Sequence, residues 1–284
     1  MNKTTKILAV LSTVVLISGC GALANFQGRD RILKIVQNSS ETETSSQSFN
    51  YEDYAKVLET YVNDRGEVDY AKLKENRAAL DRFNQSLAEL NPATYSAWSE
   101  AEQIAFWVNA YNSLTLQAII DRYPVDSIRN IPGVWKVLTF EVLGEPVTLD
   151  AIEHKILRKE FNEPRIHMSL VCAAVGCPHL RQEPYRGETL DAQLDEDTRT
   201  FLSIDRNFKI DADGGKVYLS SIFDWFGQDF EKTYGNTNKF SQFGEKEKSV
   251  LNFASNYLSK EQLAQLEQAE KVSYLDYDWS LNRQ

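Results

Sequence analysis

One long segment, residues 96–123, constrains the fold more than any other part of the sequence. Trp107 and Tyr111 recur at helical spacing on one face, but positions between them, such as Phe106 and Val108, are apolar as well. A helix that is apolar nearly all round is normally buried. The proline that follows ends the pattern, because it pushes the residue before it out of helical geometry. We therefore expect a long buried helix here.

Shorter elements precede and follow this helix. Apolar residues at helical spacing predict helices over residues 54–61, 73–90, 152–157, 190–202, 220–230, 245–258 and 260–269. Asp150 and Glu153 fit a capping-box start for the helix over 152–157. Strands are predicted in hairpins at 140–147 and 207–219, as a buried strand at 165–172 and as a half-buried strand at 272–277. Helices outnumber scattered strands, so the predicted class is α+β, a mainly helical single domain with a small, mostly antiparallel sheet.

The N-terminus has the pattern of an export signal. Lys3 and Lys6 precede a short apolar run, which identifies residues 1–19 as a signal peptide too short to span a membrane. Small residues lead directly into Cys20, as in a bacterial lipobox, so we expect a lipid on this thiol. By analogy with Gram-negative lipoproteins, Gly21 in place of Asp favours the outer membrane. The expected location is the cell envelope, lipid-anchored to the outer membrane and facing the periplasm.

Beyond the signal, composition separates a tether from a globular part. Residues 20–48 are largely polar and are expected to form a flexible tether from the lipidated Cys20. Residues 49–284 carry the apolar content of a single globular domain. Loss of two lysines with the signal takes the formal net charge from −10 to −12, so nucleic acid is excluded as a partner. The expected contact is with the membrane, through the lipid; an envelope protein or small-molecule partner stays unknown.

Reactive residue types gather in residues 165–180, which hold two of the three histidines and both cysteines that follow Cys20. Cys172 and Cys177 are close together in a chain expected to enter an oxidising compartment. The first interpretation is therefore a disulfide between them. It would close a small loop and contribute roughly 2 kcal/mol at best.

A second interpretation makes Cys172 a thiol nucleophile that a histidine ionises. In a regular strand His167 and Cys172 would face opposite sides, because their spacing is odd. His154 and His179 are alternative bases. Three residues are candidates to orient the base: Glu153, Asn109 and Asn112.

A third interpretation is a metal site. Its ligands would be His167, Cys172, Cys177 and His179. Cys-x4-Cys-x-His is not a common zinc spacing, so this hypothesis ranks last. We expect no metal and no cofactor. Asn109 and Asn112 share a face of the long helix, where they either tie loops to it or form the polar floor of a pocket.

Several motifs together resemble domain-of-unknown-function family 547. They are Ala105–Asn112, Ile152–His154 with Arg158, Pro164–His167, Cys172, Cys177-Pro178 and the closing Tyr274–Asn282. The resemblance spans about residues 101–202. It implies no reaction, since the family has no assigned activity and includes bacterial exported proteins and plant proteins with added coiled coils. The residues that match the family motifs are Asn109, Asn112, Glu153, His154, Arg158, His167 and Cys172.

These observations lead to two functional hypotheses. The first is an uncharacterised cell-envelope lipoprotein that acts as a binding or scaffold protein. Its polar pocket, with Asn109, Asn112 and Arg158, would lie between the long helix and residues 165–179. The alternative is a papain-like thiol hydrolase or acyltransferase that uses Cys172 with His167 or His154 as base.

Overall fold

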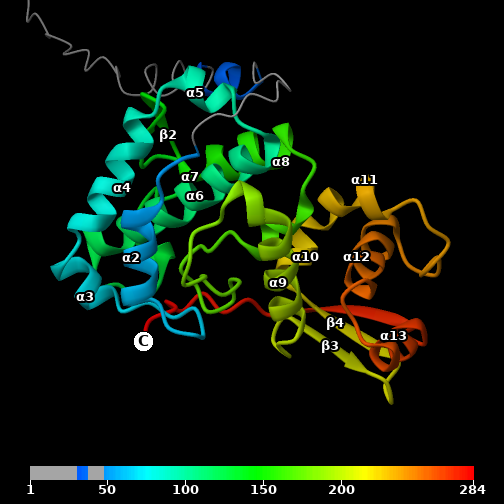
Figure 1. The fold of residues 1–284 in the computed structure, drawn as a ribbon. Helices are drawn as coiled ribbons and strands as arrows, with labels where there is room; N and C mark the ends of the chain where they lie inside the picture. Colours follow the sequence, from blue (N-terminus) through cyan, green and yellow to red (C-terminus); the bar gives the residue numbers. More distant parts are fainter. Residues whose placement is uncertain (1–30, 38–47) are drawn as a thin grey trace, which may run out of the picture.

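The computed structural model describes residues 31–37 and 48–284. The predicted signal peptide, Cys20 and most of the expected tether lie outside these residues. Figure 1 shows a large helical body and, beside it, a smaller part that carries a three-stranded sheet. Their apolar side chains form two separate hydrophobic clusters. The fold class is confirmed as α+β.

The helical body is built from the first two thirds of the described chain. Its α-helices are α2 (Glu52–Tyr61), α3 (Tyr70–Glu75), α4 (Ala78–Glu89), α5 (Pro92–Ser96), α6 (Glu100–Arg122), α7 (Leu149–Ala151), α8 (Arg158–Glu160) and α9 (Leu190–Leu202). A π-helical turn, η2 (Ile152–Leu157), joins α7 to α8, and 3-10 turns occur at η1 (Ile128–Asn130), η3 (Pro164–Met168) and η4 (Gly187–Thr189). Strands β1 (Phe140–Val142) and β2 (Glu145–Val147) form an antiparallel hairpin, as predicted.

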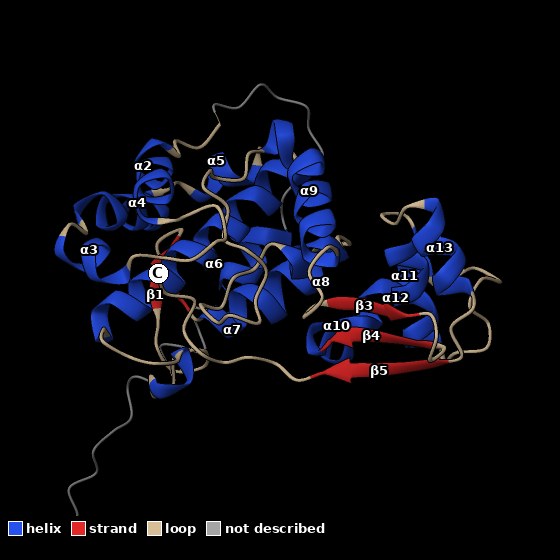
Figure 2. Cartoon of the chain, turned by 90° about the horizontal axis from the view of Figure 1, so that it is seen from below, coloured by secondary structure: helices blue, strands red, loops and turns tan. Residues whose placement is uncertain are grey.

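The smaller part follows α9, whose last turns belong to its core. It contains β3 (Phe208–Asp211), β4 (Lys216–Ser220), α10 (Ser221–Phe226), η5 (Gly227–Phe230), α11 (Glu231–Tyr234), α12 (Glu245–Ser255), α13 (Lys260–Glu267) and β5 (Lys271–Leu275). The predicted hairpin is β3 with β4, and β5 adds in parallel to β4. The chain then runs from β5 back to the helical body, where it ends (Figure 2).

Helix α6 is the buried helix that the sequence predicts. Ser99 caps its first turn by accepting from the Glu102 amide, and the polar side chains of Glu102 and Gln103 are buried together with the apolar ones. Helices α3 and α4 pack against it. Despite the length of α6, no helix within the described ranges is both long and apolar enough to cross a membrane.

Three local predictions are wrong. The single helix predicted over residues 73–90 is two helices, α3 and α4, with a turn at Asn76 and Arg77 between them. Residues 165–172 do not form a strand: Pro164 begins a 3-10 turn, and the Glu163 carboxylate accepts from the Arg165 amide at its start. The apolar residues whose pattern predicted a strand are buried in the core, and they pair with no neighbouring strand. The helix after β2 is capped by Thr148, which accepts from the Ala151 amide, and not by a box of Asp150 and Glu153.

Part of the expected tether is ordered. Residues 31–37 are helical, and Ile32 and Val36 join the hydrophobic cluster of the helical body. Arg31 pairs with Glu145 of β2 at 3.1 Å. For these seven residues the structure differs from a flexible tether, because two apolar side chains are enough to pack one face of a short helix.

Two asparagines of α6 hold the loops that cover it. The Asn112 amide donates to the Ser169 carbonyl at 2.9 Å and accepts from the Val171 N–H at 2.8 Å. Asn109 makes the same pair of bonds with both backbone groups of Tyr185, at 2.8 and 3.0 Å. Each buried amide thus satisfies a backbone donor and acceptor that would otherwise be unpaired.

Replacing Asn112 by Ala should destabilise the protein by about 2–4 kcal/mol, because it leaves a buried carbonyl and a buried N–H without partners. The free energy of unfolding, from urea titrations, measures this loss. The control is Asn76→Ala at the exposed end of α3, which should cost less than about 0.5 kcal/mol. Equal effects of the two substitutions would contradict the role assigned to Asn112.

Candidate functional site

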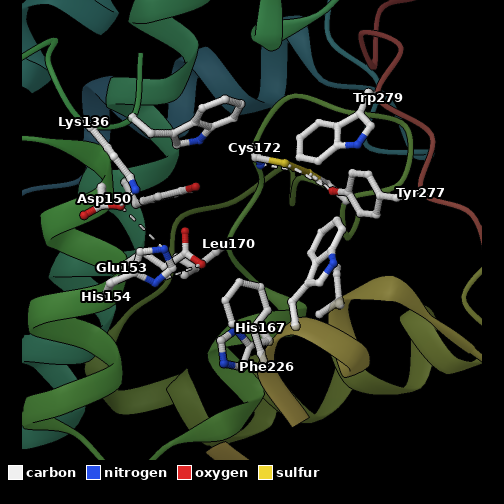
Figure 3. A pocket seen from close by; sticks show the side chains of 15 residues that line it. Lys136, Asp150, Glu153, His154, His167, Leu170, Cys172, Phe226, Tyr277 and Trp279 are labelled. Atoms are coloured by element: carbon white, nitrogen blue, oxygen red, sulfur yellow. Dashed lines mark hydrogen bonds and ion pairs between the residues drawn. A yellow bond between two sulfur atoms is a disulfide. The ribbon is translucent and has the colours of Figure 1, made fainter. Parts of the chain in front are cut away.

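A cavity of about 350 Å³ opens between the helical body and the smaller part (Figure 3). The body contributes Tyr111, Trp135, Lys136, Asp150, Glu153, His154, His167, Leu170, Cys172 and Cys177. The smaller part and the closing segment contribute Ile222, Trp225, Phe226, Tyr277 and Trp279. This size falls within the range of small-molecule sites. We call it the inter-lobe pocket.

Aromatic rings form one wall of the inter-lobe pocket. Tyr277 lies with its ring centroid 4.6 Å from that of Trp279 and 4.9 Å from that of Trp225. Trp135 meets Trp279 edge-on from the helical body at 6.1 Å. Trp225 is 46% exposed, which is unusual for so large an apolar side chain. Arg129 already lies over Trp279, with its guanidinium carbon 5.2 Å from the ring centroid, so Trp225 is the exposed ring of this wall.

The opposite side carries carboxyl groups from the turn that joins α7 to α8. Glu153 lies on this π-helical turn, with its side chain only 13% exposed. Burial raises the pKa of its carboxyl to about 7, although the Tyr111 hydroxyl donates to it and the positive charge of Arg158 opposes the shift. Near neutral pH Glu153 is therefore divided between a neutral acid and a carboxylate, and can give or take a proton.

Both pocket histidines belong to one polar chain. Arg158 donates to Nδ1 of His154 at 3.0 Å and forms a two-pronged pair with Asp229. His167 places Nε2 2.8 Å from the same Asp229 carboxylate, and its ring stacks on Phe226 at 4.4 Å. Arg158 occupies the Nδ1 lone pair of His154, so the neutral ring carries its proton on Nε2.

Burial determines which of these hydrogen-bonded side chains are charged. It lowers the pKa of both His154 and His167, against the attraction of Asp150 for the first and of Asp229 for the second. Burial raises the pKa of the Asp229 carboxyl, but the hydrogen bonds from His167 and Arg158 outweigh burial and hold this pKa below its ordinary value. The histidines are thus held neutral next to a firmly ionised aspartate.

Cys172 and Cys177 form a disulfide at the back of the inter-lobe pocket. The Tyr277 hydroxyl lies 3.0 Å from the Cys177 sulfur and 3.2 Å from that of Cys172. The Cys172 N–H also donates to the Cys177 sulfur at 2.9 Å. Within the described chain no histidine hydrogen-bonds to either sulfur, so the structure does not bring together the cysteine and histidine of a papain-like pair.

The remaining candidates lie outside the inter-lobe pocket. Asn109 and Asn112 do not line it, because their amides are used to hold loop backbone. Arg158 lies behind the lining and faces a neighbouring groove. His179 accepts from Arg206 at 3.3 Å on another surface. In residues 31–37 and 48–284 no group of three or more His, Cys, Asp or Glu side chains is placed to hold a metal ion.

Several lining residues carried no sequence signal of their own. Tyr277 and Trp279 lie in the closing segment, where the family resemblance was a signal, but nothing linked them to the cysteines. Trp225 and Phe226 sit in a predicted helix and resemble core residues. Asp229, the partner of His167, is one of many acidic residues in an acidic chain. Only the fold reveals that these positions meet.

Replacing Glu153 by Gln tests its protonation. Because burial raises the pKa from an ordinary 4.5 to about 7, the neutral acid stabilises the fold fully below pH 4.5, and this contribution is lost as the pH rises through 7. The difference between the two values corresponds to roughly 3 kcal/mol. Glutamine cannot ionise, so the stability of the variant relative to wild type should rise by about that amount from pH 4.5 to 8.5.

Urea unfolding of wild type and Glu153→Gln between pH 4.5 and 8.5 measures this change in the free energy of unfolding. Taking the difference between them cancels the titration of the other groups, including the histidines. A difference that stays constant with pH would show that Glu153 is ionised in the folded protein throughout.

Comparison with known proteins identifies a family that part of the chain resembles. No curated protein and no solved structure matches the chain. The family model described as "Protein of unknown function, DUF547" matches residues 95–202. That range contains the carboxyl and cysteine side of the inter-lobe pocket, whereas Trp225, Tyr277 and Trp279 lie beyond it. Residues 95–202, less than half of the chain, thus resemble the DUF547 family of proteins of unknown function.

Proposed function

We propose that this protein is a binding protein of the cell envelope whose inter-lobe pocket takes a small organic cation. The observation that carries the proposal is that an aromatic wall with an exposed Trp225 and two carboxyl groups, Asp150 and Glu153, line one cavity. Ring faces attract cations through their quadrupole, and carboxylates attract them by charge.

The cationic groups near the pocket do not cancel this preference. Lys136 lies 3.9 Å from Asp150, but its side chain is 79% exposed, so it can move into solvent when a ligand enters. Arg158 is engaged by Asp229 behind the lining. The chain as a whole has a formal net charge of −10, which favours the approach of cations.

Glu153 gives the proposed site a means to adjust its charge. In the empty pocket burial keeps a large fraction of this carboxyl protonated near neutral pH. A bound cation favours the ionised form, so binding should release part of a proton. When no ligand is bound, protonation of Glu153 avoids the free-energy cost of a buried, unpaired carboxylate.

Choline and its uncharged isostere 3,3-dimethylbutan-1-ol provide a matched pair of probes. Tryptophan fluorescence and calorimetry should show choline binding about tenfold or more tightly than the alcohol, since a cation over partly desolvated rings gains about 1–2 kcal/mol. Trp225→Leu should remove most of this preference. Val137→Ala, at an exposed apolar residue outside the pocket lining, serves as the control.

Equal affinities for choline and the alcohol would refute recognition of charge. Binding of neither probe, together with binding of neutral sugars or acids from a metabolite panel, would refute the cation class while keeping a binding role. A hydrolase that uses Cys172 has less support, because this sulfur is in a disulfide and has no histidine partner.

The lipid anchor is a separate part of the proposal and rests on the sequence around Cys20. In a Gram-negative host, the full chain should fractionate with outer membranes and incorporate labelled palmitate. Cys20→Ser should abolish the label and release the protein from the membrane pellet. Cys172→Ser is the matched control and should leave both unchanged. Palmitate incorporation into the Cys20→Ser variant would contradict the assignment.

A further inference from the structure

The disulfide is poorly placed to act only as a structural link. It closes a loop of few residues, for which the chain-entropy model gives roughly 2 kcal/mol at best. The loop is already held on two sides. Asn112 of α6 holds the backbone just before it, at Ser169 and Val171. The closing segment binds the loop itself through Val175 N–H to the Ser280 carbonyl and Gly176 N–H to the Asp278 carbonyl, both at 2.9 Å.

The two sulfurs have different environments. Cys177 is 2% exposed, whereas Cys172 is only partly buried, and both line the inter-lobe pocket. The Cys177 sulfur accepts from the Cys172 N–H and from the Tyr277 hydroxyl. Donors directed at a sulfur stabilise it as a thiolate. This arrangement makes Cys172 the sulfur open to attack and Cys177 the sulfur suited to leave.

Tyr277 is held over the disulfide by close packing. A Cβ added to Gly176 would lie 2.9 Å from the Tyr277 ring, so only glycine lets the phenol approach the loop this closely. On its other side the ring packs against Trp225 and Trp279. The hydroxyl is therefore fixed in place and does not depend on a mobile side chain.

From this geometry we propose that the Cys172–Cys177 disulfide is a redox-active group that accepts electrons from a thiol entering the inter-lobe pocket. The thiolate attacks the Cys172 sulfur, forms a mixed disulfide with it and breaks its bond to Cys177. Cys177 leaves as a thiolate, which the Tyr277 hydroxyl and the Cys172 amide stabilise. This activity is independent of whether the pocket selects cations.

A second thiol completes the reaction. It attacks the ligand sulfur of the mixed disulfide, and Cys172 leaves as a thiolate that takes up a proton. Two thiols are thus oxidised to one disulfide, while the protein disulfide is reduced to two thiols and receives the two protons. Glu153, whose pKa of about 7 lets it accept a proton, lines the same pocket and can take the one that an incoming thiol loses. A small-molecule or protein disulfide would reverse the steps and restore the starting state.

The first experiment measures reduction of the full chain carrying Cys20→Ser, in which Cys172 and Cys177 are the remaining cysteines. Dithiothreitol is neutral and so does not depend on the proposed cation preference. Quenched alkylation followed by mass spectrometry gives the rate at pH 8. A redox-active disulfide should be reduced in the folded protein at a rate that rises linearly with dithiothreitol. A rate that saturates at the unfolding rate would overturn the proposal.

Tyr277→Phe then tests the leaving group, because it removes one donor while keeping the ring. Reduction should slow by about tenfold, as expected for loss of a hydrogen bond to a charged sulfur. Tyr274→Phe is the matched control and should leave the rate unchanged, because the hydroxyl of Tyr274 on β5 donates to Glu247 on α12, away from the disulfide. An equal rate for wild type and Tyr277→Phe would overturn the role of the phenol.

Single-cysteine variants test the direction of attack. Treated with 2-hydroxyethyl disulfide, Cys177→Ser, which keeps Cys172, should form the mixed disulfide about tenfold or more faster than Cys172→Ser, which keeps Cys177. Circular dichroism shows whether each variant is folded. Faster reaction at Cys177 would reverse the assignment and overturn the proposed mechanism.

Discussion

The burial of α6 is the constraint on which the rest of the structure depends. A helix buried on all sides cannot leave its amide side chains in water, so Asn109 and Asn112 must find partners inside the protein. They find them in the backbone of two loops, at Tyr185 and at residues 169–171. The backbone that leads into the cysteine loop is therefore fixed to a long buried helix, which positions the disulfide in the inter-lobe pocket.

The closing segment completes the site from the other direction. After β5 the chain returns to the helical body, where the Tyr70 hydroxyl donates to Asn282 at 2.6 Å and the Leu281 side chain is buried. On the way it pairs with the cysteine loop and places Tyr277 about a hundred residues along the chain from the sulfurs it contacts. The inter-lobe pocket thus joins the DUF547 segment to a part of the chain outside it.

The ionisable side chains in and behind the pocket differ in their protonation. Burial keeps both histidines neutral, while hydrogen bonds with Arg158 and Asp229 orient them and occupy one ring nitrogen of each. For Glu153 desolvation outweighs the hydrogen bond from Tyr111 and the charge of Arg158, and raises its pKa to about 7. Groups of the same type therefore differ because of what packs around them.

The sequence by itself determined the α+β class, the buried helix and most element boundaries, because these depend on apolar periodicity, glycine turns and proline breaks within short windows. It also identified the segment that holds both cysteines and His167, and it named Glu153 and His154 as candidates. It misread residues 165–172, since a short apolar run has the same pattern in a strand and in a buried irregular segment. Only the tertiary structure decided that Asp229 holds His167, that the asparagines clamp loops and that Tyr277 covers the disulfide. Those contacts join residues separated by tens to hundreds of positions, and they form only when the whole chain packs. The local sequence around a side chain does not indicate which distant residue it will contact.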